Sequence, residues 1–568
     1  MNFQKKMLPY ILLVASAFML WNAWIAENAP KVTPQDTTSI SVPTTSTITG
    51  TETNIVSNTD NIPNVPTASA QPNKVSQNSQ IDQLIHVKTD VLDVAIDVNS
   101  GNLVKSSLLK FPQEQNKAEV PLTLFTSDPK KFYQAQSGFL SVSGQKEAIT
   151  YTAEEKNYIL TADQQSLTVT LNGVSSSGLA FVKAYTFYPG SYSVNQSYSV
   201  TNNGTTPWSG YYYSQLVRSD EVPDASDGTA RYTFFGAATS TPEQHYNKVS
   251  FSSMDKEAVD LQKIQGGWVA MLQHYFVSAL VPNKDQKVNF YSNVDSANHL
   301  YTIGVLSPTL SVESGKNYQS SMQLYSGPAT ANNLEKVAPN LKLTIDYGWL
   351  WFISIIIFWL MQHIYDIVGN WGWSIVLVTV VIKIIFYQLS AKSYRSMAAM
   401  KQLQPRIKTL QERFSDNKQE LSKAMMELYK KEKVNPLGGC FPLLIQIPVF
   451  IALYWVIVES VELRQAPFIF WIHDLAMKDP FYVLPIIMGL TMFIQQKISP
   501  PPPDPVQAKV MMLLPVVFTV FFLQFPAGLV LYWIVNNTLS ISQQWYMMRK
   551  YSGEKIDNKT HKKLDKKR

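Results

Sequence analysis

Long apolar segments are the feature that most constrains how this chain can fold. They lie at residues 7–25 and again between Gly348 and Met547, and a long polar stretch separates them. A segment of about 20 apolar residues matches the hydrocarbon core of a bilayer. The mean hydropathy is only −0.07 over 568 residues. The sequence therefore predicts a multi-domain membrane protein, with a water-soluble domain between membrane segments.

The amino-terminal segment is either a cleavable signal peptide or a permanent anchor. Two lysines precede the apolar run from Met7 to Trp24, as they do in both kinds of segment. The far end of the run carries the bulky Trp21 and Trp24, and no small-x-small cleavage site follows. We therefore expect an uncleaved transmembrane anchor at residues 1–26.

Two regions of different amino-acid composition follow the anchor. Residues 27–81 are rich in Thr, Ser, Asn, Pro and Gln and lack aromatic residues, which predicts a disordered polar linker. In residues 82–341, β-rich stretches such as Val91–Val98 alternate with turn signals such as Asn172-Gly173, which predicts a large β-sandwich. The aromatic run Tyr211-Tyr212-Tyr213 either belongs to its core or binds sugar or peptide.

Residues 342–371 join the predicted sandwich to the second apolar region. The segment Tyr347–Val368 is either a membrane span or a helix that lies in the membrane interface. Tryptophan prefers the interface, and this segment carries Trp349, Trp351 and Trp359. The next span also begins close by. We therefore expect an interfacial amphipathic helix.

Five apolar spans follow and, with the anchor, make a six-span α-helical bundle. They form a five-span core at 372–546, near residues 372–390, 441–461, 482–498, 510–525 and 528–546. Basic residues gather in segment 391–433 and in the tail 547–568, and such segments stay in the cytoplasm. Both termini are then cytoplasmic and the β-sandwich is external. The span 510–525 gives about 24 Å of helix, which is shorter than the core of the bilayer and favours local thinning.

The basic segment 391–433 has two helical periods. Apolar residues recur at helical spacing on either side of Ser415-Asp416-Asn417, and several of them are methionines. This pattern predicts a cytoplasmic hairpin of two amphipathic helices with a methionine-rich face.

Lys383 is the most unusual residue of the spans. It lies in the apolar run Ile375–Phe386, about 10 Å from the inner end of that span at 1.5 Å per residue. A lysine at such depth is costly, so its ammonium either snorkels to the inner headgroups or faces a wet cavity. Thr379, Lys383 and Tyr387 are spaced i, i+4 and i+8, which predicts one polar stripe.

Further polar residues fall inside other spans. Gln446 lies in the second core span, and Trp533, Asn537 and Ser540 share a face of the last span at i, i+4 and i+7. They either hold the bundle together by hydrogen bonds or line a cavity shared with Lys383. No carboxylate lies deep in any predicted span. We therefore predict a hydrophilic cavity whose cation attracts an acidic group of a passing chain.

Other functions leave little trace in the sequence. It contains no nucleotide-binding loop, no H-E-x-x-H zinc motif and no G-x-S-x-G elbow, and the single cysteine, Cys440, excludes a cysteine cluster. We expect no cofactor, no metal and no catalytic residue. His473-Asp474 is expected to be a packed tip of an external loop, and Glu459 and Glu462 are expected to be solvated. We find no internal repeat of the transporter kind.

Three runs in the apolar region resemble the YidC/Oxa/Alb insertase family. They are Asn435–Pro448, Val461–Pro467 with Trp471–Asp474, and Phe525–Tyr532. The resemblance implies five spans around a groove that opens to the cytoplasm and to lipid. It also implies that the groove contains Lys383, where the family more often has arginine, and that Thr379, Gln446, Asn537 and Ser540 line it while Trp533 contacts substrate.

The same resemblance implies a function and a set of partners. The anchor, the linker and the large external β-domain are similar to the domain layout of those family members that lie in the inner membrane of Gram-negative bacteria. Members insert newly made membrane proteins into the bilayer and help them fold, alone or with the Sec translocon. The basic hairpin and the tail are then expected to bind a ribosome or a nascent chain electrostatically.

Overall fold

The computed structural model describes residues 83–115, 117, 119–175, 178–222, 233–414, 417–432, 434, 441–500 and 505–552. The predicted anchor 1–26, the linker 27–81 and the tail beyond Ser552 lie outside these residues. The described chain contains β-strands from Leu84 to Pro328, with the short helix α3 (Phe251–Met254) between two of them, and is mainly helical from there onward, as the sequence predicted.

The strands form two sheets. The first contains β1 (Leu84–Lys88), β2 (Leu92–Asp97), β3 (Asn102–Pro112), β4 (Pro121–Phe125), β5 (Tyr133–Ser141), β7 (Asn157–Ile159), β11 (Trp208–Ser219), β14 (Asp260–Gln265), β17 (Lys287–Asp295), β18 (Leu300–Leu306) and β19 (Leu310–Val312). The second contains β6 (Ile149–Ala153), β8 (Leu167–Ser175), β9 (Leu179–Phe187), β10 (Ser193–Asn202), β12 (Gly236–Ser240), β13 (Asn247–Ser250), β15 (Trp268–Gln273), β16 (Phe276–Pro282) and β20 (Asn317–Pro328).

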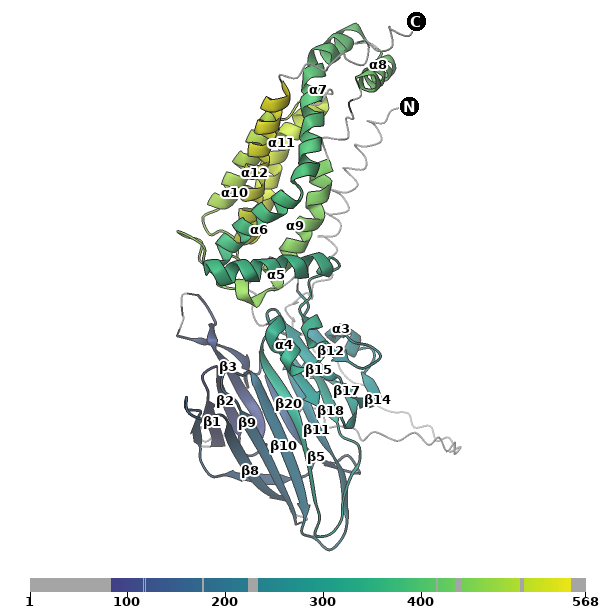
Figure 1. Cartoon of the computed structure of the whole chain (residues 1–568). Coiled ribbons are helices and arrows are strands. Elements are labelled where there is room, and N and C mark those ends of the chain that lie inside the picture. The colour runs from purple at the N-terminus through teal and green to yellow at the C-terminus, as the bar shows by residue number, and fades with distance from the viewer. Residues whose placement is uncertain are drawn as a thin grey trace, which may run out of the picture. The chain divides into compact units, whose positions relative to one another are not determined.

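Both sheets are built mainly from antiparallel neighbours. The first sheet runs β14-β17-β18-β11-β5-β3-β2-β1-β7, with β19 paired to β11 and β4 paired to β3. The second runs β13-β12-β15-β16-β20-β10-β9-β8-β6. Among the named strand pairs, the pairing of β1 with β7 is parallel. The long strands β9, β10 and β20 lie side by side in Figure 1 and pair over most of their length.

The inner faces of the two sheets pack against each other. Burial alternates along β9, so that one face of the strand is buried and the other faces out. The Phe139 ring of β5 lies 4.7 Å from the Phe181 ring of β9, and Tyr198 of β10 stacks on Tyr212 of β11 at 3.4 Å. The predicted β-sandwich is therefore confirmed, and Tyr212 belongs to its core.

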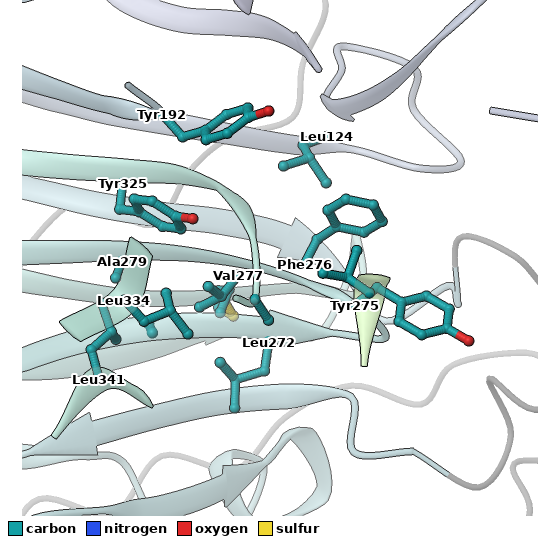
Figure 2. Packing of buried hydrophobic residues seen from close by; sticks show 14 of the residues in the cluster. Leu124, Tyr192, Leu272, Tyr275, Phe276, Val277, Ala279, Tyr325, Leu334 and Leu341 are labelled. Carbon is teal, nitrogen blue, oxygen red and sulfur yellow. The ribbon is translucent and has the colours of Figure 1, made fainter. Parts of the chain in front are cut away.

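Figure 2 shows the apolar packing around the turn between β15 and β16. The Phe276 ring lies near Leu124, and Phe111 contacts Phe276 edge-on at 5.6 Å. Leu334 and Leu341 are fully buried and close this part of the core. They belong to α4 (Ala331–Val337) and to the 3-10 helix η2 (Leu341–Thr344), which follow the last strand.

The carboxyl-terminal half is helical (Figure 1). Its elements are α5 (Trp351–Val368), α6 (Trp371–Ile385), α7 (Tyr387–Arg413), α8 (Lys418–Lys431), α9 (Phe441–Glu459), the 3-10 helix η4 (Val461–Leu463), α10 (Val483–Ile498), α11 (Pro505–Phe522) and α12 (Ala527–Ser552). The five predicted core spans overlap α6, α9, α10, α11 and α12.

Length and apolar composition single out few of these helices as spans. Among the described residues, α5 is long and apolar enough to cross a membrane, and α6 with α7 would be a second span if the two count as one bent segment. The apolar parts of α9, α10 and α11 are shorter. The count of six spans and the interfacial position of α5 therefore stay predictions.

The first core span differs from its predicted form. We expected one helix over 372–390, but α6 ends at Ile385 and the chain bends by 68° before α7. The start of α6 follows the sequence more closely. Gly369 ends α5 with a φ of 69°, and the Asn370 side chain caps α6 by accepting a hydrogen bond from the Trp373 backbone N–H at 3.1 Å.

The basic hairpin consists of the later part of α7 and α8. Asn417 caps α8, close to the predicted junction. The two helices share a small apolar core of Leu403, Ile407 and Tyr429, with Met400 and Met425 packed at its edge. The predicted pair of amphipathic helices is confirmed, but these two methionines are partly buried in the hairpin's own core.

Candidate functional site

Lys383 on α6 meets the last helix, α12. Its Nζ donates a hydrogen bond to Ser540 Oγ at 2.7 Å, and Ser540 Oγ in turn donates to the Asn536 carbonyl at 2.7 Å. The polar residue predicted on one span thus contacts a polar residue predicted on another. No ion pair joins Lys383 to a carboxylate in the part of the chain that the structure describes.

Asn537 faces a different neighbour. Its Nδ2 donates to Thr491 Oγ1 of α10 at 3.2 Å. One helical turn past Ser540, the buried Gln544 donates through Nε2 to Ser499 Oγ at 3.0 Å. The polar residues of α12 therefore join it to α6 and to the region of α10.

Gln446 and Trp533 carry buried donors that have no protein acceptor. Neither Gln446 Nε2 nor Trp533 Nε1 has a hydrogen-bond partner in the described structure. The Trp533 ring packs edge-on against Phe450 of α9 at 4.9 Å and lies 5.3 Å from Phe522 of α11. Gln446 precedes Phe450 by one helical turn, so the two donors lie on the facing sides of α9 and α12.

Thr379 and Tyr387 do not extend the cluster as predicted. Thr379 is 1% exposed, and its hydroxyl donates to the Ile375 carbonyl of its own helix at 2.6 Å. Tyr387 lies beyond the bend at the start of α7 and is 45% exposed. The predicted single stripe of Thr379, Lys383 and Tyr387 is therefore wrong, because it required one continuous helix.

The acidic residues at the outer end of α9 differ from their predicted state. Glu459 is buried, beside Asp346 and Lys248, which form an ion pair. Glu462 follows the helix, and burial raises the pKa of its carboxyl to about 7. Neither residue is simply solvated, because the sandwich and the loop after α9 cover this end of the helix.

The pair His473-Asp474 lies in a packed loop. Asp474 accepts a hydrogen bond from the Ala476 backbone N–H at 2.8 Å, and burial raises the pKa of its carboxyl. Among the described residues no set of three His, Cys, Asp or Glu side chains is placed to hold a metal ion. Cys440 lies outside those residues.

Several polar residues near the cluster were not singled out from the sequence. Gln544 follows Ser540 by four positions, so extending the helical period would have found it. Thr491 and Ser499 are single hydroxyls in or beside an apolar helix and give little signal, since such residues often bond only to their own helix.

The exposed surface of the helices defines the class of the protein. Large apolar side chains on α10 and α11, among them Ile486, Leu490, Leu513 and Val516, are exposed over about half or more of their area. Water-soluble proteins rarely expose so continuous an apolar surface. Together with the β-sandwich, this defines an integral membrane protein with a large domain outside the bilayer.

The comparisons with known proteins name the family. Residues 84–360 match the YidC periplasmic domain, and residues 363–555 match the 60Kd inner membrane protein family. A membrane protein insertase YidC from Coxiella burnetii is 44% identical over 570 residues, covering 99% of this chain and 100% of its own length. Its counterpart from Legionella pneumophila is 48% identical over 559 residues, covering 97% of this chain and 98% of its own length. The chain therefore belongs to the YidC family.

Membership of this family implies an inner-membrane protein whose β-sandwich lies in the periplasm. A crystal structure of an active YidC insertase with its first transmembrane domain resolved is also similar, at 17% identity and a TM-score of 0.39. The match covers 82% of this chain and 92% of that one. The relatives carry the name of insertases, not of enzymes.

Proposed function

We propose that this chain inserts newly made membrane proteins into the inner membrane and assists their folding. Near-full-length similarity to insertases from two other bacteria supports this proposal. So does the chemistry of the α6–α12 contact. An insertase has to lower the cost of moving hydrophilic peptide into a bilayer, which requires polar groups within the apolar region.

The observation that carries the proposal is the state of Lys383. Its ammonium is held by Ser540, a neutral hydroxyl, and the described residues supply no carboxylate to neutralise it. A positive charge inside a span is costly, and an acidic group on a substrate offsets that cost by pairing with it. Lys383 with Gln446, Trp533, Asn537 and Ser540 would then line a hydrophilic groove that receives the external tail of a substrate.

The remaining steps follow from the same physical chemistry. The basic hairpin of α7 and α8 and the basic tail would attract a ribosome or a nascent chain. The short span at α11 would thin the bilayer and shorten the polar path. The apolar segment of the substrate would then slide into lipid, driven by its own transfer free energy. We propose that the chain acts alone or beside the Sec translocon, and that it needs no nucleotide, metal or cofactor.

The proposal is tested by depleting the protein in cells and restoring it as Lys383→Glu, Lys383→Ala or Lys383→Arg. The substrate is a membrane protein with a short acidic periplasmic tail. We expect Lys383→Glu to reduce its insertion by about tenfold or more, since a repelling charge replaces an attracting one. Lys383→Ala should be weaker in effect, and Lys383→Arg should restore insertion because the charge is kept.

The matched control is Lys497→Glu. Lys497 is also a lysine near the inner end of a span, but it lies over the Phe493 ring of its own helix at 4.9 Å. It should support insertion at close to the normal level. Equal insertion by Lys383→Glu and the unaltered chain, at equal protein levels, would show that the charge at this position has no role in the process.

A further inference from the structure

The periplasmic loop between α9 and α10 exposes large apolar side chains. Phe470 is 81% exposed and Phe481 is 66% exposed, and Ile469 and Tyr482 are also exposed. We call these four residues the outer-loop patch. Isolated apolar residues are common on protein surfaces, but two phenylalanines this open within one short loop are not.

The backbone of the loop is built so that these side chains point outward. Phe470 has a φ of 54° and Tyr482 a φ of 57°, in the left-handed region that costs a residue with a side chain about 1–2 kcal/mol. Such a backbone conformation persists only where the surrounding structure enforces it. The exposure of the patch is therefore a property of the folded loop.

Asp479 enforces this conformation from inside the loop. It is buried, and its Oδ1 accepts hydrogen bonds from the Trp471 indole N–H and the Phe481 backbone N–H, both at 3.0 Å. Its Oδ2 accepts from the Leu484 backbone N–H at 2.7 Å, at the start of α10. One carboxylate thus holds Trp471, which follows Phe470, and the backbone of Phe481 itself.

The loop is also tied to α12. The Ala527 backbone N–H donates to the Met477 carbonyl at 2.7 Å, and the Gly528 N–H donates to the Leu475 carbonyl at 2.9 Å. These bonds join the loop to the first turn of the helix that carries Ser540. The patch is consequently presented by a rigid part of the helical domain.

The β-sandwich contacts the loop through other residues. Arg464 donates to the Pro112 and Gln113 carbonyls, and the His473 carbonyl accepts a hydrogen bond from Gln115. These contacts are polar and use the beginning and middle of the loop. The four residues of the patch stay exposed with those contacts in place.

The patch continues the lipid-facing surface of two helices. Phe481 and Tyr482 lead directly into the exposed apolar face of α10, which carries Ile486 and Leu490. At the other end of the loop, Phe468 packs edge-on against Trp373, an exposed residue of α6, at 5.4 Å. Apolar side chains that adjoin the exposed sides of membrane helices favour the same lipid surroundings as those helices.

We propose that the outer-loop patch inserts into the outer leaflet of the inner membrane and anchors the loop there. The partner is the acyl chain region just below the phosphates, where aromatic side chains at a membrane surface are favoured. Burying the two phenylalanines in lipid, at about 25 cal/mol per Å² of apolar area, offsets the cost of the left-handed backbone at Phe470 and Tyr482. This proposal does not depend on the insertase activity or on Lys383.

Spin labels test the depth of the patch. In the full chain with Cys440→Ser, a nitroxide is attached at Phe470→Cys, at Phe481→Cys and, as a matched control, at Lys478→Cys, an exposed polar position of the same loop. Each protein is reconstituted into vesicles of phosphatidylethanolamine and phosphatidylglycerol. Relaxation by oxygen, which dissolves in lipid, is compared with relaxation by a nickel complex, which stays in water.

We expect the labels at 470 and 481 to favour oxygen over nickel by about threefold or more relative to the label at 478. The same ratio at all three positions would show a solvated loop and overturn the proposal. Protection of 470 and 481 from both reagents would show that protein covers the patch, and would overturn it equally. The unchanged spectrum and elution volume of the Lys478→Cys protein serve as the check on folding.

Discussion

At the scale of single residues, the β-sandwich contains a lysine that is as unusual as the one in the spans. Lys183 of β9 is 1% exposed and points between the sheets. Its Nζ donates to the Gly101 carbonyl at 2.5 Å and to the Ser137 carbonyl at 3.2 Å. Burial, and then the positive charge of Lys146, lower the pKa of Lys183 to about 7, while Asp97 acts in the opposite sense.

This depressed pKa makes the stability of the sandwich depend on pH. The unfolded chain binds a proton at Lys183 up to about pH 10.5, but the folded chain releases it above about pH 7. The free energy of unfolding should therefore rise with pH between those values, by up to about 1.4 kcal/mol per pH unit from this group. Lys183→Met should abolish that part of the rise.

The measurement is urea unfolding of the full chain in detergent at pH 7 and at pH 9.5. The resistance of the sandwich to protease at each urea concentration reports how much of it is folded. The difference between the unaltered chain and Lys183→Met isolates this lysine from other groups that titrate. Parallel pH profiles for the two proteins would mean that Lys183 stays charged in the folded state.

The two lysines show what residue-level reasoning finds. Lys383 was identified because a charge in a long apolar run is visible in the sequence alone. Lys183 was missed because a lysine in a water-soluble domain is usually exposed, although this one shares a face of β9 with the buried Phe181 and Tyr185. Its inward direction follows from the register of β9 with β10, which pairs Lys183 with Tyr198 of the core.

At the scale of elements, α10 and α11 touch at a glycine. A Cβ on Gly489 would lie 2.0 Å from Thr519 Oγ1 and 3.2 Å from Thr519 Cβ. Gly489→Ala should therefore push the two helices apart and destabilise the helical domain by about 1–3 kcal/mol. The expected result is a lower temperature of aggregation in detergent, measured by the loss of the monodisperse elution peak.

Thr519→Ala supplies the matched control for this prediction. It removes the atom that would clash, so the double variant Gly489→Ala, Thr519→Ala should recover part of the lost stability. Thr519→Ala by itself should have a small effect, since its hydroxyl donates only to the Pro515 carbonyl of its own helix in the described contacts. A double variant no better than Gly489→Ala would indicate that the helices do not pack through this pair.

The helices were located from their apolar composition, but their breaks were not. Pro448 and Pro515 lie inside α9 and α11, although proline usually ends a helix in water. The sharp bend falls instead at Phe386, where no proline or glycine marks it. Apolar surroundings tolerate proline in helices because neighbouring groups satisfy the freed carbonyls. The rule that proline ends a helix, which holds for helices in water, therefore fails in these apolar helices.

At the scale of the whole molecule, the sandwich is connected to the helical domain by polar contacts whose partners could not be paired from the sequence alone. Arg464, from the Val461–Pro467 motif, places two guanidinium nitrogens on two consecutive carbonyls of the β3–β4 hairpin, at 3.0 Å and 3.1 Å. Gln465 Nε2 adds a third hydrogen bond, to the Pro112 carbonyl. The contact joins residues about 350 positions apart, so only the folded chain reveals it.

We expect Arg464→Met to release the β3–β4 hairpin, because it removes two charge-assisted hydrogen bonds worth about 1.5–3 kcal/mol each. Trypsin should then cleave after Lys117, an exposed residue near the tip of the hairpin, about tenfold faster or more. Arg464→Lys should give an intermediate rate, since lysine keeps the charge but not the planar fork. Cleavage after Lys316, on the loop before β20, is the internal control and should not change. If both sites are cleaved at the rates of the unaltered chain, Arg464 does not hold the hairpin. The sandwich is then attached mainly through other contacts, such as the hydrogen bond between the His274 ring and the Val458 carbonyl at 2.8 Å.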